Sequence, residues 1–310
     1  MTTILLDLVL ITISTGLLWK GSHWLVDSAV RIAHKLRMSD LTIGLTIVAM
    51  GTSAPEFAVT INAAIRGLPD ISVSNIVGSN IFNLGFILGG CAVIRNIQTT
   101  PALVWRDGLF LLGTSSILVL FLKDLVLTSQ EGLALFATLV VYIGYLFWKK
   151  APAHEKAPGG NATWKDIPIF VLGIIAMAAG GHVLVWSAVS LARAFDISEW
   201  VIGVTIVAAG TSAPEFATSL VAALKGRYGI SAGNLIGSDL YNLLGVLGLA
   251  GMLRPLTIDA AGLESLYILV GMVLLVVVFM RTGFRVSRAE GCLLVGLNLI
   301  RWIFDFSAQG

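Results

Sequence analysis

Long apolar runs, separated by short polar segments, follow one another along the 310-residue chain. Each run is at least as long as the roughly 17 residues that a helix needs to cross the hydrocarbon core of a bilayer. The first run has no basic residue before it and no small-residue cleavage site, so we interpret it as a span rather than a signal peptide. The pattern predicts ten transmembrane helices, near residues 4–34, 41–65, 71–94, 105–123, 128–148, 166–194, 200–224, 230–252, 262–280 and 288–307.

The two halves of the chain repeat each other. A polar linker at residues 149–165 separates a first half of five spans, 1–148, from a second half of five, 166–310. A shift of 159 residues aligns 42–89 with 201–248 without a gap, and 26 of the 48 pairs are identical. Because five is odd, the second half is expected to enter the membrane upside down. The predicted fold is an all-α integral membrane protein of two inverted repeats, an arrangement typical of carriers with a midplane site.

Composition and charge agree with this class of protein. The chain is 56% hydrophobic and only 12% charged, whereas roughly a quarter of the residues in soluble domains are charged. The net charge of +2 is too small to indicate a nucleic-acid partner. The predicted spans place thirteen basic residues on one side of the membrane and five on the other, which predicts termini outside and a cytoplasmic linker. Cys91 and Cys292 lie in apolar runs without metal or disulfide spacing, and we expect both to be small core residues.

The segment GTSAPEF occurs at residues 51–57 and again, unchanged, at residues 210–216. Pro55 has no N–H, so the carbonyl of Gly51 loses its helical partner, and the second copy repeats the arrangement. Unpaired carbonyls are costly in a membrane unless they are satisfied or line a cavity. A desolvated cation could satisfy them. The alternative is a kinked helix packed against its neighbours.

Each copy also carries a glutamate, Glu56 or Glu215, deep within a predicted span. Ionised groups at such depth are expensive and usually functional. The threonine four residues earlier shares a helix face with the glutamate, and a serine follows that threonine. These hydroxyl residues are Thr52, Ser53, Thr211 and Ser212. Two protonated glutamates bonded to neighbouring helices are the alternative, but the duplication favours an ion site.

A second duplicated segment follows each glutamate, SVSNIVGSNIFNLG at residues 72–85 and SAGNLIGSDLYNLL at residues 231–244. In each copy a serine and an asparagine stand four residues apart on one helix face: Ser79 with Asn83, and Ser238 with Asn242. Gly78 and Gly237 would permit close helix approach in lipid. Alone, these polar residues would favour contacts between helices. Beside the glutamates we interpret them as ligands.

The candidate ligands are all oxygen atoms, which suits hard cations. Ca²⁺ takes 6–8 oxygen ligands, whereas Mg²⁺ demands tighter geometry and sheds water reluctantly. Two ionised glutamates balance one Ca²⁺ or two Na⁺, and a third Na⁺ would leave the loaded site positive. Calcium and sodium could therefore compete for overlapping oxygens, which is the requirement for exchange.

With these motifs the sequence resembles the Na⁺/Ca²⁺ exchanger family of the cation/Ca²⁺ antiporters over nearly its whole length. The resemblance implies a multi-pass protein of the cell (inner) membrane that couples Na⁺ entry to Ca²⁺ extrusion by alternating access. It implies that long first and sixth helices slide past a core of the second, third, seventh and eighth. It also implies no enzyme activity, no cofactor besides the transported ions Ca²⁺ and Na⁺, and that a monomer is sufficient for transport; the oligomeric state stays open.

The resemblance also implies a ligand set. It assigns Glu56 and Glu215 as shared ligands of Ca²⁺ and Na⁺. The remaining ligands would be Thr52, Thr211, Ser53, Ser79, Ser212, Ser238, the carbonyls of Ala49 and Ala208, and, at the centre, Asn83 and Asn242. Some relatives place an aspartate where Asn242 stands. The centre is therefore expected to lack a third carboxylate, which argues against K⁺ co-transport.

Four residues near the motifs receive no firm role. Asp239 stands where the first half has Asn80, and a place beside the ion path, a hydrogen bond to a helix end and an interfacial position are all open to it. His23 and His182 are matched by the repeat, and we expect them to form hydrogen bonds rather than sense pH. Asp27 has no assignment.

Three other functions fit parts of the pattern. A H⁺/Ca²⁺ antiporter would use the same glutamates but has less need for the neighbouring hydroxyls. A cation channel is less suited, because channel filters are commonly rings from several subunits. An intramembrane hydrolase would need a group to activate a hydroxyl, and the motifs contain no histidine or lysine.

Overall fold

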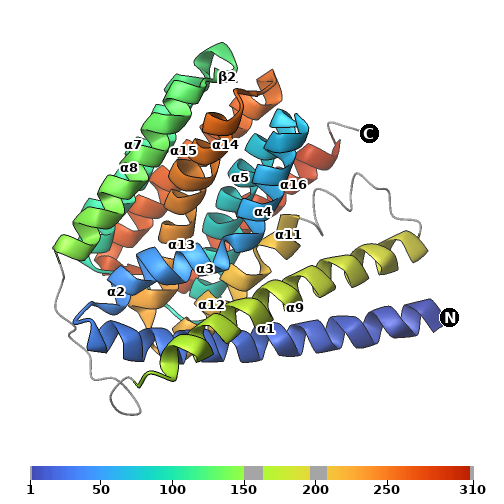
Figure 1. Ribbon diagram of the computed structural model, residues 1–310, viewed down its shortest axis with the longest axis vertical. Helices are drawn as coiled ribbons and strands as arrows, with labels where there is room; N and C mark the ends of the chain where they lie inside the picture. The colour runs from blue at the N-terminus through green and yellow to red at the C-terminus, as the bar shows by residue number, and fades with distance from the viewer. Residues whose placement is uncertain (1, 150–162, 196–207, 308–310) are drawn as a thin grey trace.

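The computed structural model describes residues 2–149, 163–195 and 208–307, and these are almost entirely helical (Figure 1). Seven of the described helices are long and apolar enough to cross a membrane, and a bent pair at residues 40–66 makes an eighth if it counts as one span. The predicted span at 200–224 lies partly outside the described residues. The number of ten spans stays a prediction.

The first half begins with a long helix, α1 (Thr2–Lys35). A broken helix follows, made of α2 (Asp40–Ile43), the π-helical segment η1 (Gly44–Val48), α3 (Ala49–Thr52) and α4 (Ala54–Arg66). The next is continuous through α5 (Pro69–Phe82), the π-helical η2 (Asn83–Leu88) and α6 (Gly89–Ile94). The half ends with η3 (Leu103–Gly108), α7 (Leu109–Phe121), η4 (Leu122–Asp124) and α8 (Ser129–Trp148).

The second half follows the same plan. Its elements are α9 (Asp166–Ala194), α11 (Ala208–Thr211), α12 (Ala213–Leu224), α13 (Tyr228–Leu240), the π-helical η6 (Tyr241–Val246), α14 (Leu247–Leu253), α15 (Ala260–Arg281), η7 (Thr282–Phe284) and α16 (Arg288–Ser307). The shift of 159 residues that aligns the motifs also superimposes the bounds of α3 on those of α11, and of α8 on those of α16. The sequence repeat therefore extends to the bounds of these described elements.

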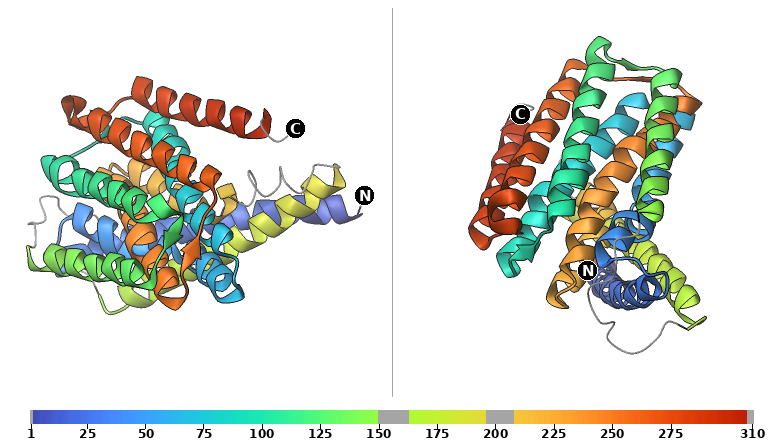
Figure 2. Two further views of the ribbon diagram at one scale, coloured as in Figure 1. Left: turned by 90° about the horizontal axis from the view of Figure 1, so that it is seen from above. Right: turned by 90° about the vertical axis from the view of Figure 1, so that its left-hand side faces the viewer.

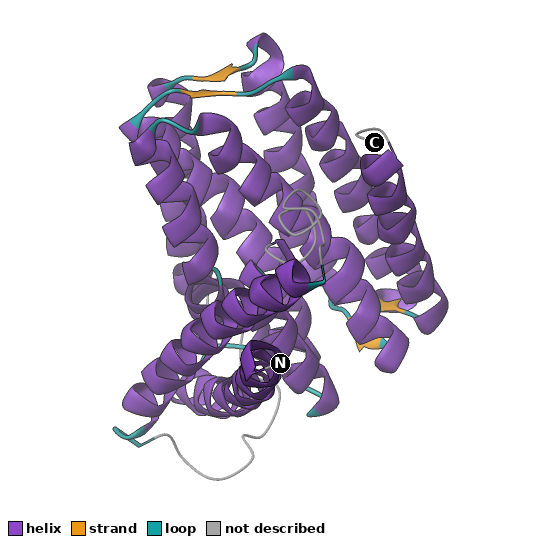
Figure 3. Ribbon diagram, turned by 90° about the vertical axis from the view of Figure 1, so that its right-hand side faces the viewer, coloured by secondary structure: helices purple, strands orange, loops and turns teal. Residues whose placement is uncertain are grey.

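Two short antiparallel strand pairs join the halves. β1 (Ile97–Gln98) pairs with β4 (Arg285–Val286), and β2 (Val126–Leu127) pairs with β3 (Leu256–Thr257). The repeat relates β1 to β3 and β2 to β4. The β1–β4 pair is therefore equivalent to the β3–β2 pair. The two pairs lie at opposite ends of the helical body (Figure 3). Equivalent loops of the two halves thus occupy opposite ends.

The long helices α1 and α9 pack along each other, at a steep angle to most of the remaining helices (Figures 1 and 2). Gly21 and Gly173 allow this close approach: a Cβ at Gly173 would lie 2.9 Å from the carbonyl oxygen of Gly21. Small residues at such crossings let helix backbones meet in an apolar solvent.

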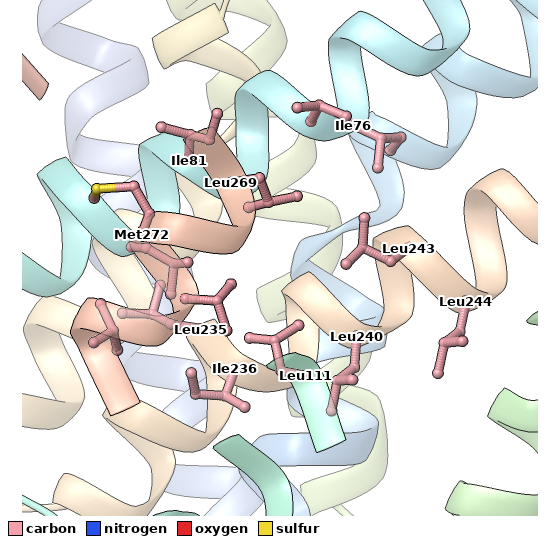
Figure 4. Close-up of a cluster of buried hydrophobic side chains, with 14 of the residues drawn as sticks. Ile76, Ile81, Leu111, Leu235, Ile236, Leu240, Leu243, Leu244, Leu269 and Met272 are labelled. Carbon is pink, nitrogen blue, oxygen red and sulfur yellow. The ribbon is translucent and has the colours of Figure 1, made fainter. Parts of the chain in front are cut away.

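The larger hydrophobic cluster of the described residues lies among the other helices, and a smaller one includes buried side chains of α1 and α9. The buried side chains of the larger cluster come from both halves and include Ile76, Leu111, Leu235, Leu240 and Leu269 (Figure 4). Cys91 is buried in this core, as expected, but Cys292 is exposed on α16, so the expectation for Cys292 is wrong. A lipid-facing side chain is as apolar as a core side chain, and composition alone does not separate the two.

Gly237 confirms the expected close helix approach, because a Cβ there would lie 2.7 Å from the Cα and carbonyl oxygen of Leu45 in η1. A Cβ at Gly78 would meet no described atom. The counterpart of Leu45 in the second half, residue 204, lies outside the described residues, so the expectation for Gly78 stays a prediction.

Replacing Gly237 with alanine should destabilise the protein, because backbone atoms of Leu45 cannot move aside as a flexible side chain can. Overpacking of this kind typically costs about 1–3 kcal/mol. A thermal melt of the purified protein in detergent should therefore show a lower Tm for Gly237→Ala. Gly113→Ala is the control, since a Cβ at Gly113 has open space around it. Equal melting temperatures for the two variants would contradict the close packing.

Candidate cation site

Both copies of GTSAPEF break a helix at the same position. Ser53 separates α3 from α4 with φ −79° and ψ 11°, and Ser212 separates α11 from α12 with φ −87° and ψ 9°. In the first half the two parts of the span differ in direction by 51°. Each proline stands in the first turn of the new helix, where its missing N–H costs nothing. The predicted interruption is confirmed in both halves.

Glu56 and Glu215 follow in the first turns of α4 and α12, and both are fully buried. The hydroxyl of Ser53 donates to Glu215 Oε1 over 2.9 Å, and the hydroxyl of Ser212 donates to Glu56 Oε1 over 3.1 Å. The serine of each broken helix thus reaches the glutamate of the other half. This crosswise bonding brings the two carboxylates into one site, near enough for their charges to repel.

The threonines lie against the same carboxylates. Thr211 lies beside Glu56, and Thr52 lies with Ser238 beside Glu215. The Thr52 hydroxyl is also 3.0 Å from Asn234 Oδ1 and 3.3 Å from the Ser238 hydroxyl. Neutral oxygens from both halves therefore surround the glutamate pair.

Asn83 and Asn242 lie in the π-helical segments η2 and η6. Such segments often occur at functional sites. Asn83 Nδ2 donates to Asp239 Oδ1, and Asn242 Nδ2 donates to Asn80 Oδ1, each over 3.0 Å. Asp239 is fully buried, which excludes the interfacial position. Asp239 bonds directly to Asn83, but within the described residues it forms no three-acid metal-binding group with the glutamates, so the expectation that the centre lacks a third carboxylate stays a prediction.

Five buried oxygens of these residues have no hydrogen-bond partner among the described residues: Glu56 Oε2, Glu215 Oε2, Asn83 Oδ1, Asn242 Oδ1 and Asp239 Oδ2. An unsatisfied buried polar group costs about 1–3 kcal/mol. In the part of the chain that the structure describes, no three His, Cys, Asp or Glu side chains form a metal-binding group. A cation here would be held by carboxylates together with neutral oxygens. Hard cations such as Na⁺ and Ca²⁺ prefer oxygen ligands of this kind, whereas softer metals do not.

The remaining predicted ligands also lie in buried surroundings or at the breaks. Ser79 is buried in α5. The carbonyl of Ala49 accepts the Ser53 N–H over 3.0 Å and the Thr52 hydroxyl over 3.2 Å. Ala208 begins α11, directly after residues that lie outside the described part.

Sequence reasoning missed Asn80 and Asn234, which bond to predicted ligands. A signal existed for Asn234, because the repeat matches it to Asn75. Asn75 Nδ2 donates to the Thr60 hydroxyl and Asn234 Nδ2 donates to the Ser219 hydroxyl, each over 3.0 Å. The repeat also relates Thr60 to Ser219, so the two hydrogen bonds are equivalent.

Residues outside the motif have other partners. His23 bonds to the Trp19 carbonyl in its own helix over 2.9 Å, the role that we expected. His182 is exposed. Asp27 of α1 forms an ion pair with Lys225, with 2.5 Å between Oδ1 and Nζ.

Fold and site define a membrane transport protein built from two related halves, each of which contributes a broken helix and a buried glutamate. The family described as sodium/calcium exchanger protein matches residues 6–149 and 165–304, one stretch in each half. The chain belongs to this sodium/calcium exchanger family. It is thus an antiporter of a family of transporters, not of enzymes.

Individual relatives agree over nearly full length. The putative antiporter CaxA of Alkalimonas amylolytica is 37% identical, over 90% of this chain and 92% of CaxA. The sodium/calcium exchanger MaX1 of Methanosarcina acetivorans is 30% identical, over 94% of this chain and 96% of MaX1. A structure of the sodium-calcium exchanger NCX_Mj, soaked with zero Na⁺ and Ca²⁺, matches with a TM-score of 0.85 and 29% identity, over 96% of this chain and 98% of that one.

Calcium should stabilise the purified protein, because a ligand that binds only the folded state adds about 2.7 kcal/mol at 100 times its Kd. We expect Ca²⁺ to raise the Tm of the wild type in sodium-free detergent solution. Glu215→Gln should lose this rise, because it removes one of the two buried glutamate carboxylates. Glu264→Gln, at an exposed carboxylate of α15, should keep it. A full Ca²⁺-dependent rise in Glu215→Gln would contradict the assignment of the site.

Proposed function

We propose that this chain exchanges Na⁺ for Ca²⁺ by alternating access, at a midplane site formed by Glu56, Glu215 and the surrounding oxygens. The crosswise bonding of the two glutamates carries the proposal. Each carboxylate receives one serine hydroxyl from the opposite half and keeps a second oxygen without a described partner. That second pair of oxygens is available to a cation.

Charge accounts for exchange at such a site. The described ion pairs give no fixed cation to Glu56 or Glu215. Two buried negative charges are strongly unfavourable unless they are compensated. One Ca²⁺ or two Na⁺ neutralise them equally, so the two kinds of ion compete for the same oxygens. MaX1 and NCX_Mj are both named as sodium/calcium exchangers, and similarity to them supports Na⁺ as the ion exchanged for Ca²⁺.

The proposal includes the topology: ten spans of the cell (inner) membrane in two inverted halves, with both termini outside and residues 149–165 in the cytoplasm. The strand pairs support it. β1 and β4 lie in loops to which the basic-residue count assigns the inner side, and they pair with each other. β2 and β3 lie in the opposite loops and pair likewise. One chain supplies both glutamates, so a monomer would be sufficient for transport.

Flux measurements test the proposed exchange directly. In proteoliposomes at clamped pH, an outward Na⁺ gradient should drive uptake of ⁴⁵Ca²⁺. Glu56→Gln and Glu215→Gln should reduce this uptake to the level of empty liposomes, because each variant removes one charge that Ca²⁺ requires. Glu264→Gln should transport normally.

Uptake that follows a proton gradient and ignores Na⁺ would replace the proposal with H⁺/Ca²⁺ antiport. Normal uptake by both glutamine variants would refute the glutamate site. Single-channel currents would refute the carrier mechanism.

Cysteine labelling tests the topology. In a variant that lacks Cys91 and Cys292, a cysteine at exposed Lys123 should react with an impermeant maleimide on intact cells. A cysteine at exposed Gln98, in β1, should react only after the membrane is opened. The reverse pattern would place the termini in the cytoplasm, and equal reactivity in intact cells would refute the arrangement of the spans.

A further inference from the structure

Four buried side chains, Asn80, Asn83, Asp239 and Asn242, form a polar quartet between α5–η2 and α13–η6. Asn83 Nδ2 donates to Asp239 Oδ1 and Asn242 Nδ2 donates to Asn80 Oδ1, each over 3.0 Å. Asn80 Nδ2 also donates to the backbone carbonyl of Asp239 over 3.1 Å. All four are at most 1% exposed.

The repeat relates Asn83 to Asn242 and Asn80 to Asp239, so the two side-chain bonds are counterparts. They differ in one respect: the acceptor is an amide oxygen in one and a carboxylate oxygen in the other. The amide of Asn80 forms the same bond without a charge. The hydrogen bond therefore does not require an acid at position 239.

A carboxylate at this depth carries a cost that an amide does not. Removal of an ion from water costs several kcal/mol even after the protein relaxes. Asp107, another buried acid, is compensated: it accepts two bonds from Arg106, over 2.6 and 2.9 Å, and one from Tyr142 over 2.8 Å. Asp239 takes part in none of the described ion pairs, and its Oδ2 has no described partner.

Asp239 thus resembles Glu56 and Glu215, since each of the three acids has one bonded oxygen and one oxygen without a described partner. Asp239 lies near enough to Glu215 for their charges to repel. The three acids do not form a single metal-binding group within the described residues. Asp239 therefore lies next to the glutamate pair and does not share a single cation position with Glu56 and Glu215.

We propose that Asp239 is an additional cation ligand, and that its Oδ2 with the amide oxygens of Asn83 and Asn242 forms a subsite for Na⁺ next to the glutamates. Both amide oxygens are buried and without a described partner. The inference rests on the proposed exchange and extends its charge balance. Three carboxylates neutralise three Na⁺, whereas one Ca²⁺ leaves a single negative charge. The third acid favours full sodium occupancy over calcium.

Equilibrium binding of ²²Na⁺ and ⁴⁵Ca²⁺ to the purified full chain tests the subsite. Asp239→Asn should lower Na⁺ affinity tenfold or more, with a smaller loss for Ca²⁺. The matched variant is the exchange Asn80→Asp with Asp239→Asn, which moves the acid to the repeat-related position of the quartet. It should restore Na⁺ affinity to within about threefold of the wild type, whereas a purely structural role of Asp239 predicts no restoration.

Unchanged Na⁺ binding in Asp239→Asn would overturn the subsite and leave the proposed exchange intact. A wild type that binds neither ion would overturn both. If Asp239→Asn does not fold, the anomalous density of Tl⁺, a monovalent probe, in wild-type crystals decides the question. A Tl⁺ peak at Asp239 Oδ2 supports the subsite, and peaks at the glutamates alone overturn it.

Discussion

Acidic side chains buried in an apolar body, without a fixed positive partner, are the constraint on which this structure depends. Arg106 and Tyr142 show how the same protein compensates a buried acid permanently, at Asp107. Glu56 and Glu215 have no such partner among the described ion pairs, and serine hydroxyls satisfy only one oxygen of each. A buried charge that no fixed group of the chain neutralises has to be neutralised by an exchangeable ion. In the proposed function, transported cations supply that neutralisation.

The backbone around the site serves this arrangement. The breaks at Ser53 and Ser212 turn each serine toward the other half, and the π-helical segments carry Asn83 and Asn242. Close contact between Gly237 and Leu45 keeps α13 against the broken first-half helix. The polar groups therefore lie between closely packed helices and are buried from bulk solvent.

Much of this was predictable from sequence, because duplication marks the functional positions twice. The breaks and the buried glutamates were predicted from GTSAPEF alone. The crosswise direction of the bonds was not, since Ser53 stands three residues from Glu56 and the sequence gives no sign that it reaches Glu215 instead. The burial of Asp239 was also hidden. Every residue from Ile230 to Leu240 is buried, so α13 has no polar face whose periodicity could locate the acid.

The exposed Cys292 and the short strands mark another limit. Lipid contact and core contact select the same apolar residues, so a run of them does not say which way a side chain faces. Strands of two residues are too short to produce an alternating pattern, and their pairing depends on loops that are far apart in sequence. These features arise from the tertiary arrangement of the halves.

The strand pairs have a mechanical consequence. Each pair joins a loop of the first half to a loop of the second, one pair at each end of the helical body. Two halves held in this way cannot part as rigid bodies at either end without tearing a backbone pairing. In the proposed alternating access, an opening that keeps both strand pairs would come from α1 and α9, which cross the body at a steep angle and lie outside the paired loops. On that proposal, the segments that bind ions and the segments that open are separate parts of the same chain.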